Sequence, residues 1–125
     1  MSSVHFRVRL TDRAKDDLRR IGKKYGKKTY ETIRDLIRGL EFDPEKQGEP
    51  LQGILRGLYS LHYSRFRLIY RIDKEEFVVL VVAGGYHKED SRTDIYKLIE
   101  RALESGRLVI HEEKPADSSD SSREE

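Results

Sequence analysis

The sequence predicts an α+β domain in which a helical hairpin and a C-terminal helix pack on a small, mainly antiparallel, twisted sheet. Three observations predict this fold class. Apolar residues recur at helical spacing in two neighbouring stretches near the N-terminus and once more near the C-terminus. Three strand-like runs stand between them, close enough together to form antiparallel hairpins. The chain of 125 residues is long enough for one domain, and the expected order of elements is β-α-α-β-β-β-α.

A strand and two helices are expected at the start of the chain. Residues 4–10 alternate apolar and polar side chains, which is typical of a half-buried strand. Thr11 can cap a helix over residues 12–24 through its side-chain oxygen. Gly26 ends this helix, and the helical spacing of apolar residues resumes over residues 27–41. The two amphipathic helices form a hairpin whose apolar stripes need a sheet to cover.

The middle of the chain predicts a loop and three strands. Residues 43–53 contain two prolines and two glycines and are expected to form a loop. Strands are expected over residues 57–63, 65–72 and 77–83. The last of these, FVVLVVA, is apolar on both sides, so it should be the buried, central strand. A pair of glycines directly after it is expected to end the strand.

The end of the chain predicts a helix and an acidic tail. The helix is expected over residues 93–104, and residues 108–110 could add a short edge strand. Residues 111–125 are rich in serine and acid and are expected to be disordered. They hold two basic and six acidic side chains, a net charge of −4, which leaves +6 for residues 1–110 within the total of +2. The chain therefore divides into a basic domain, residues 1–110, and an acidic tail.

Cationic side chains gather on one face of the strand SRFRLIYRID. Alternation along the strand puts Phe66, Leu68, Tyr70 and Ile72 on one face and Arg65, Arg67 and Arg71, together with Ile69, on the other. In the preceding strand, Ser60 and His62 fall on the arginine side. The helices are expected to cover the apolar face only. The arginine face is therefore expected to stay open for a polyanionic partner, although a solvated face with counter-charges from elsewhere in the fold explains the pattern equally well.

The sequence argues against several kinds of site. Without cysteine, the chain cannot form disulfides or thiolate metal sites, and its four histidines show no paired metal-ligand spacing. Its adjacent glycines are not followed by the Lys-Ser or Lys-Thr of a phosphate-binding loop. No apolar run is long enough to span a membrane. We therefore expect a soluble, cytoplasmic protein with no metal, no membrane attachment and no small-molecule cofactor.

Several motifs, in their order and spacing, resemble the RelE/ParE superfamily of toxins from type II toxin–antitoxin pairs. They are LTDRAKDDLRRI, LQGILRGLYSLHYSRFRLIYRID, VVLVVAGG and DIYKLIERAL, and they span residues 6–103. The resemblance implies a helical hairpin on a small twisted sheet and an antitoxin that masks the basic face. It implies one of two activities: RelE-like members cut messenger RNA in the ribosomal A site, whereas ParE-like members inhibit DNA gyrase by binding, without nuclease chemistry.

The residues favour the RelE-like activity, in which the 2′-hydroxyl attacks the neighbouring phosphate. The resemblance places Arg67 against the scissile phosphate, where a planar guanidinium can hold two oxygens. His62 lies where RelE is similar but has a lysine, and it could be the general base. Tyr96 matches a tyrosine that can stack on a base. Three residues could assist the leaving oxygen, the first two being favoured: His87, Lys88 and Arg92.

Each candidate also has an ordinary structural explanation. Arg67 could be a surface arginine, His62 a sheet histidine with a structural hydrogen bond, and Tyr96 a helix residue beside the core. A non-toxic member of the superfamily is a further alternative. On the nuclease hypothesis, the remaining polar residues of this face and its flanking loops are expected to bind RNA: Arg56, Ser60, Arg65, Arg71, Lys88 and Arg92.

Overall fold

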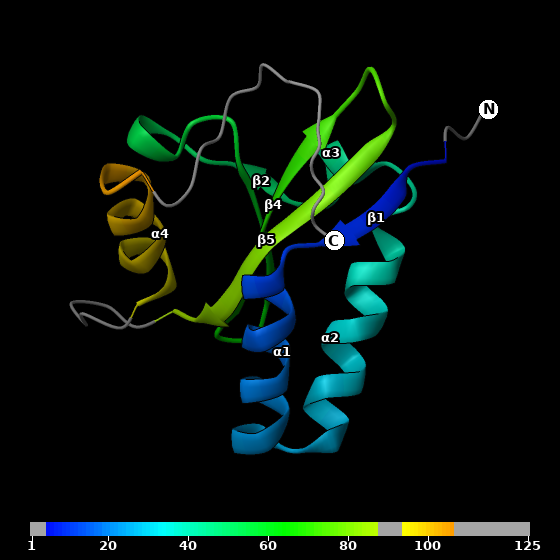
Figure 1. Ribbon diagram of the computed structural model, residues 1–125. Helices are drawn as coiled ribbons and strands as arrows, with labels where there is room; N and C mark the ends of the chain where they lie inside the picture. Colours follow the sequence, from blue (N-terminus) through cyan, green and yellow to red (C-terminus); the bar gives the residue numbers. More distant parts are fainter. Residues whose placement is uncertain (1–4, 88–93, 107–125) are drawn as a thin grey trace.

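The computed structural model describes residues 5–87 and 94–106, which form a five-stranded sheet with helices on both of its faces (Figure 1). The elements in chain order are β1 (Arg7–Leu10), α1 (Asp12–Tyr25), α2 (Lys27–Gly39), α3 (Pro44–Gln47), β2 (Glu49–Pro50), the 3₁₀ helix η1 (Gly53–Leu55), β3 (Tyr59–Tyr63), β4 (Phe66–Asp73), β5 (Val78–Tyr86) and α4 (Ile95–Glu104). The α+β fold class and the order of the long elements are confirmed.

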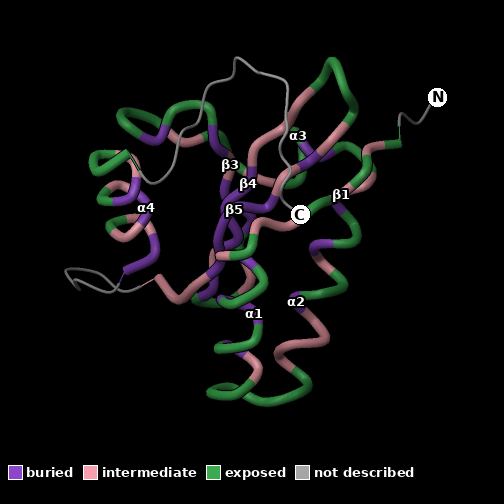
Figure 2. Tube along the Cα trace, in the orientation of Figure 1, coloured by how far each residue is buried: buried purple, intermediate pink, exposed green. Residues whose placement is uncertain are grey.

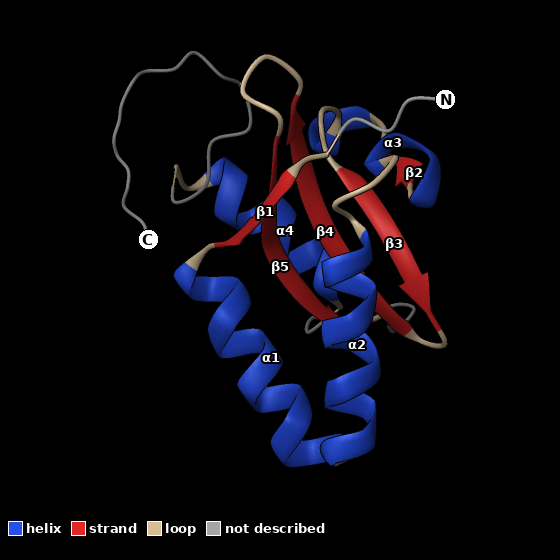
Figure 3. Ribbon diagram, turned by 90° about the vertical axis from the view of Figure 1, so that its right-hand side faces the viewer, coloured by secondary structure: helices blue, strands red, loops and turns tan. Residues whose placement is uncertain are grey.

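The sheet is mainly antiparallel, as predicted. Its strands follow the order β1-β5-β4-β3-β2. The pairs β2–β3, β3–β4 and β4–β5 are antiparallel, whereas β1 runs parallel to β5. Figure 3 shows the helical hairpin of α1 and α2 in front of the sheet and α4 behind it. The predicted edge strand at residues 108–110 and the acidic tail at 111–125 lie outside the described residues.

The predicted cap begins α1 and ties it to the sheet. Thr11 Oγ1 accepts a hydrogen bond from the Ala14 amide at 3.0 Å and donates its own proton to the Val82 carbonyl at 3.0 Å. At the other end, Gly26 has a φ of 103°, which glycine adopts without the steric strain of a side chain. This glycine therefore ends α1 and lets α2 begin at once.

The first hydrophobic core lies between the helical hairpin and the sheet. The helices contribute Leu18 and Ile33 to this core, and the sheet contributes aromatic and leucine side chains of β3 and β4. The faces follow the predicted alternation, since the core includes Leu61, Phe66, Leu68 and Tyr70, with Tyr59 and Tyr63 packed against it. Figure 2 shows the buried residues concentrated along the sheet and the inner sides of the helices.

A second core on the opposite face corrects the expectation of an open sheet. Ile95 and Ile99 of α4 pack there against Leu58, Ile69 and Val82. The sequence predicted α4 but not where it docks. Part of the arginine face is therefore covered, and only the remainder is available to a partner.

The strand β5 runs past the glycine pair that was predicted to end it. Its register against β4 shifts between Ile69 and Tyr70, which pair with Ala83 and Val81. The extra residue, Val82, forms a β-bulge that puts Val82 and Ala83 on the same side, in the second core. The unbroken apolar run of this strand thus serves two cores, and the strand continues to Tyr86.

The predicted loop at residues 43–53 contains short regular elements instead. Asp43 has a left-handed φ of 50°, and Pro44 then opens α3 at the helix start, where proline loses no hydrogen bond. The Pro44 carbonyl accepts a hydrogen bond from the buried Tyr70 hydroxyl at 2.6 Å. Burial raises the pKa of Tyr70 above its ordinary value, so this hydroxyl stays a donor.

Gly48 tests how tightly this segment packs. A Cβ on Gly48 would lie 2.4 Å from the Tyr70 hydroxyl and 2.8 Å from the Ser60 carbonyl. We expect Gly48→Ala to lower the free energy of unfolding by about 2 kcal/mol, measured by urea denaturation, since overpacking moves buried groups. A Cβ on Gly39, in α2, meets nothing within 4 Å, so Gly39→Ala should be neutral or slightly stabilising. Equal stabilities of the two variants would contradict this packing.

Candidate functional site

Three of the predicted site residues meet at one end of the sheet, on the face that carries α4. His62 of β3 lies directly opposite Arg67 of β4, and Arg67 lies opposite Gly85 of β5. His87 follows two residues after Gly85, and its backbone amide donates to the Arg65 carbonyl at 2.7 Å. The sheet therefore places an arginine between two histidines that are far apart in the sequence.

Arg67 is half-buried and is held by its own turn. Its Nη1 donates to the carbonyls of Ser64, at 3.1 Å, and Phe66, at 2.9 Å. Its Nε is buried, with no hydrogen-bond partner among the described residues. Nη1 is therefore bonded to the backbone, whereas Nε is buried and leaves its hydrogen-bonding capacity unused among the described residues.

His87 is held by a buried carboxylate. Its Nδ1 lies 2.5 Å from Oδ1 of Asp94, whose side chain is 4 % exposed, whereas a third of the His87 side chain is exposed. The second carboxylate oxygen of Asp94 accepts from the Tyr96 amide at 3.0 Å and so caps α4. The His87 ring meets the Tyr96 ring edge to face, with 5.1 Å between centroids.

Tyr96 and Ser60 join α4 to the middle of the sheet. The Tyr96 hydroxyl lies 2.8 Å from Ser60 Oγ, and Ser60 is 1 % exposed. The Ser60 hydroxyl thus serves the fold, and its predicted contact with RNA stays a prediction. The Tyr96 ring packs partly against the second core and lies beside the His87 ring.

His62 stands exposed at the rim of the same site. Its Nε2 lies 4.0 Å from Oε1 of Glu49, and 45 % of its side chain is exposed. A carboxylate at this distance can orient the imidazole without burying it. His62 is therefore open to an approaching substrate.

The other predicted RNA contacts are spread more widely. Arg65 lies in the turn before β4, and its guanidinium carbon stands 5.7 Å from the centre of the Tyr86 ring. Arg56 is exposed after η1. Arg71 lies towards the far end of β4, where it lines a cavity of about 710 Å³ together with cationic residues of β1 and α1. Lys88 and Arg92 lie outside the described residues.

A second buried carboxylate fixes the end of β5 next to the site. Asp17 of α1 accepts from the Gly84 amide at 3.0 Å and from Nη1 of Arg20 at 2.9 Å. Arg13 Nε is 3.6 Å away, an ion pair beyond hydrogen-bonding distance. Burial raises the pKa of Asp17, and the Gly84 amide and the two arginines partly oppose that rise. The carboxylate thereby ties the glycine pair of β5 to the helical hairpin.

Asp94 was missed by the sequence-based prediction. The signal that could have found it is an Asp directly before the apolar helical run IYKLI, which is a typical N-cap position. Its second role, beside His87, depends on how α4 docks on the sheet, and spacing alone does not reveal that.

Comparison with known proteins supports the fold and the class of protein. Residues 8–91 match the model of a protein family described as the ParE toxin of the type II toxin–antitoxin system parDE. The chain belongs to the RelE/ParE toxin superfamily. The toxin RelG of Mycobacterium tuberculosis is 32% identical to this toxin over 93 residues, which cover 74% of this chain and 97% of RelG.

Solved structures show the same fold for this RelE/ParE toxin. A structure of the RelBE2 toxin–antitoxin complex of Mycobacterium tuberculosis superimposes with a TM-score of 0.60 at 27% identity, covering 67% of this chain and 93% of that chain. A mutant of the E. coli toxin RelE in the free state gives a TM-score of 0.59 at 18% identity, covering 84% and 99%. Both are similar in fold, and neither comparison assigns a role to any residue of the site.

Two features are absent from the described residues: a group of potential metal ligands and a helix fit to span a membrane. Within residues 5–87 and 94–106, no three His, Cys, Asp or Glu side chains are grouped so that they could hold a metal ion. The same part of the chain contains no helix that is both long and apolar enough to cross a bilayer.

Proposed function

We propose that this type II toxin is an endoribonuclease that cuts messenger RNA on the ribosome, in the cytoplasm, in a reaction that needs no metal ion. The observation that carries the proposal is the row His62–Arg67–Gly85 across three strands, with His87 directly beyond it. Two imidazoles flanking a guanidinium provide the three functions that cleavage by a 2′-hydroxyl requires: a base, a charge stabiliser and an acid.

Each function has a side chain in a suitable setting. His62, exposed at the rim, removes the proton from the 2′-hydroxyl as the oxygen forms its bond to phosphorus. Arg67 neutralises the charge that develops on the phosphate oxygens, since a planar guanidinium can donate to two of them. His87 gives a proton to the 5′-oxygen as the P–O5′ bond breaks. The products are a 2′,3′-cyclic phosphate and a 5′-hydroxyl.

Neighbouring residues would hold the RNA around this centre. The Tyr96 ring, beside His87, is placed to pack on a base, while its hydroxyl stays bonded to Ser60. Arg65, Arg71 and Arg56 would bind phosphates farther along the strand. We propose the same role for Lys88 and Arg92, although His87 is the better candidate for the leaving-group acid because Asp94 orients it.

An antitoxin partner is part of the proposal. One structure with a similar fold, RelBE2 of Mycobacterium tuberculosis, is that of a toxin–antitoxin complex. We propose that a cognate antitoxin binds this toxin and masks its basic face. Binding of DNA gyrase is the second candidate function, because the matching family model is described as a ParE toxin.

A translation reaction separates the two functions. The purified toxin is added to ribosomes translating a defined message, and new 5′-hydroxyl ends are mapped on that message. In parallel, DNA gyrase is assayed for supercoiling with the same toxin preparation. We expect cuts in the message and unchanged supercoiling. Inhibited supercoiling with an intact message would overturn the nuclease proposal in favour of gyrase binding.

A further inference from the structure

We propose that Asp94 is a positioning residue that fixes which nitrogen of His87 exchanges protons with the RNA. The inference rests on the proposed nuclease function and deepens it. One buried carboxylate makes two hydrogen bonds, among its contacts, that bear on this choice. Oδ1 of Asp94 meets His87 Nδ1 at 2.5 Å, and Oδ2 accepts from the Tyr96 amide at 3.0 Å.

The contacts of Asp94 decide the direction of the hydrogen bond to His87. An ionised carboxylate can only accept, so Nδ1 of His87 must be the donor. The remaining nitrogen, Nε2, has no hydrogen-bond partner among the described residues, and a third of the side chain is exposed. Nε2 is thus the nitrogen that can contact the leaving oxygen. When both nitrogens carry protons, the Asp94 carboxylate accepts from Nδ1–H and stabilises the positive charge of the ring.

The ring itself is held in place from three sides. The backbone amide of His87 is bonded to the Arg65 carbonyl, and the His87 and Tyr96 rings pack edge to face. Asp94 belongs to the buried cap of α4, so it is itself fixed by the docking of that helix. Because the imidazole and the carboxylate are both immobilised, the choice of nitrogen is built into the fold, in the way a buried carboxylate orients a catalytic histidine in hydrolases.

An asparagine at position 94 reverses this choice without removing the cap. The single amide oxygen of Asn is needed to accept from the Tyr96 amide, and asparagine is as good an N-cap as aspartate. The NH₂ group then faces His87 and donates to Nδ1. Nδ1 then accepts this hydrogen bond, so neutral His87 carries its ring proton on Nε2. The doubly protonated ring is disfavoured, because its Nδ1–H would face the NH₂ group of the asparagine.

The experiment compares wild type with Asp94→Asn by two measurements. Nitrogen-15 NMR of the histidine rings, at a pH where His87 is neutral, reports which nitrogen carries the proton. We expect Nδ1–H in wild type and Nε2–H in Asp94→Asn. Cleavage of ribosome-bound message is expected to show kcat reduced at least about 100-fold, with KM changed by less than about threefold.

A matched control changes another carboxylate to an amide. Asp73 Oδ1 accepts from the amides of Glu75 and Glu76 in the turn after β4, remote from the site. Asp73→Asn should leave both the His87 NMR signals and the cleavage rate unchanged.

The outcomes separate the inference from the proposed function. An unaltered His87 tautomer in Asp94→Asn overturns the inference, and so does full cleavage by a variant whose tautomer has switched. A wild-type toxin that cuts no message overturns the proposed function and, with it, the role of Asp94 in cleavage. A switched tautomer together with a reduced kcat supports the inference.

Discussion

Replacing Arg67 by alanine is expected to lower the rate of messenger cleavage about 100- to 1,000-fold, since loss of one preorganised donor to a developing oxyanion has an effect of that size. Arg67 lies between His62 of β3 and Gly85 of β5 in the strand register, and its buried Nε lacks a partner among the described residues. The measurement is the single-turnover rate of 5′-hydroxyl formation on ribosome-bound message. Binding of the ribosome should change far less than the rate.

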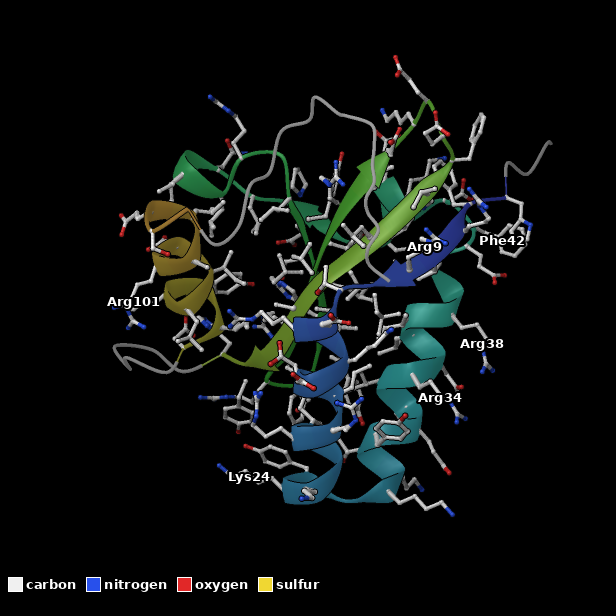
Figure 4. All side chains as sticks on the ribbon, viewed as in Figure 1. Arg9, Lys24, Arg34, Arg38, Phe42 and Arg101 are labelled. Carbon is white, nitrogen blue, oxygen red and sulfur yellow. The ribbon has the colours of Figure 1, made fainter. Side chains whose placement is uncertain are left out.

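Two further variants define what the arginine contributes. Arg67→Lys keeps the charge but not the planar fork, so it should recover only part of the lost rate. Arg38→Ala removes an exposed arginine of α2, which lies away from α4 (Figure 4), and should leave the rate unchanged. If Arg67→Ala cuts as fast as Arg38→Ala, then Arg67 is not at the scissile phosphate.

Local patterns were sufficient to predict most of the fold. The cap at Thr11, the break at Gly26 and the alternation of Leu61 with His62 are each decided by residues close together in the sequence. Such features depend on backbone preferences and on side-chain periodicity, and both can be read from a single chain. The prediction that Arg67 and His62 share a face has the same basis, because side chains alternate along every strand.

Features that depend on long-range contacts were not predicted. The bulge at Val82 occurs in a run of apolar residues that has no alternation to break, so no pattern could show it. The docking of α4 on the arginine face depends on a second core, which Ile69 and Ala83 build from two different strands. The bond between His87 and Asp94 follows from that docking. The site is therefore less predictable than the fold around it.

The hydrophobic cores on the two faces of the sheet hold different helices in place. The first core joins the helical hairpin to β3, β4 and β5, whereas the second joins mainly α4 and η1 to the sheet. The described part of the site draws on the second core, because Asp94 and Tyr96 both belong to the start of α4. A change in the second core should thus affect function more than it affects global stability.

Replacing Ile99 by alanine tests this division. Ile99 is fully buried between α4 and the sheet, and truncating it should weaken the docking of α4 by about 3 kcal/mol. Hydrogen exchange should show faster exchange of the α4 amides, with the protection of α1 largely kept, because regions with few packing partners open locally. Cleavage should fall at least about tenfold, since each 1.4 kcal/mol of lost docking is a factor of ten in the docked population once docking becomes marginal.

Ile33→Ala provides the matched comparison, because Ile33 is equally buried but belongs to the first core. Its truncation should lower the free energy of unfolding of the whole domain by a similar amount, about 3 kcal/mol. It should leave the cleavage rate of the folded fraction intact, since no residue of the site rests on α2. The two substitutions remove the same side-chain atoms, so a difference between them reports the position and not the chemistry. The contradicting result would be an equal increase in amide hydrogen exchange in α1 and α4 of Ile99→Ala. In that case α4 and the hairpin would unfold as one cooperative unit, and the site would not be less stable than the rest of the domain.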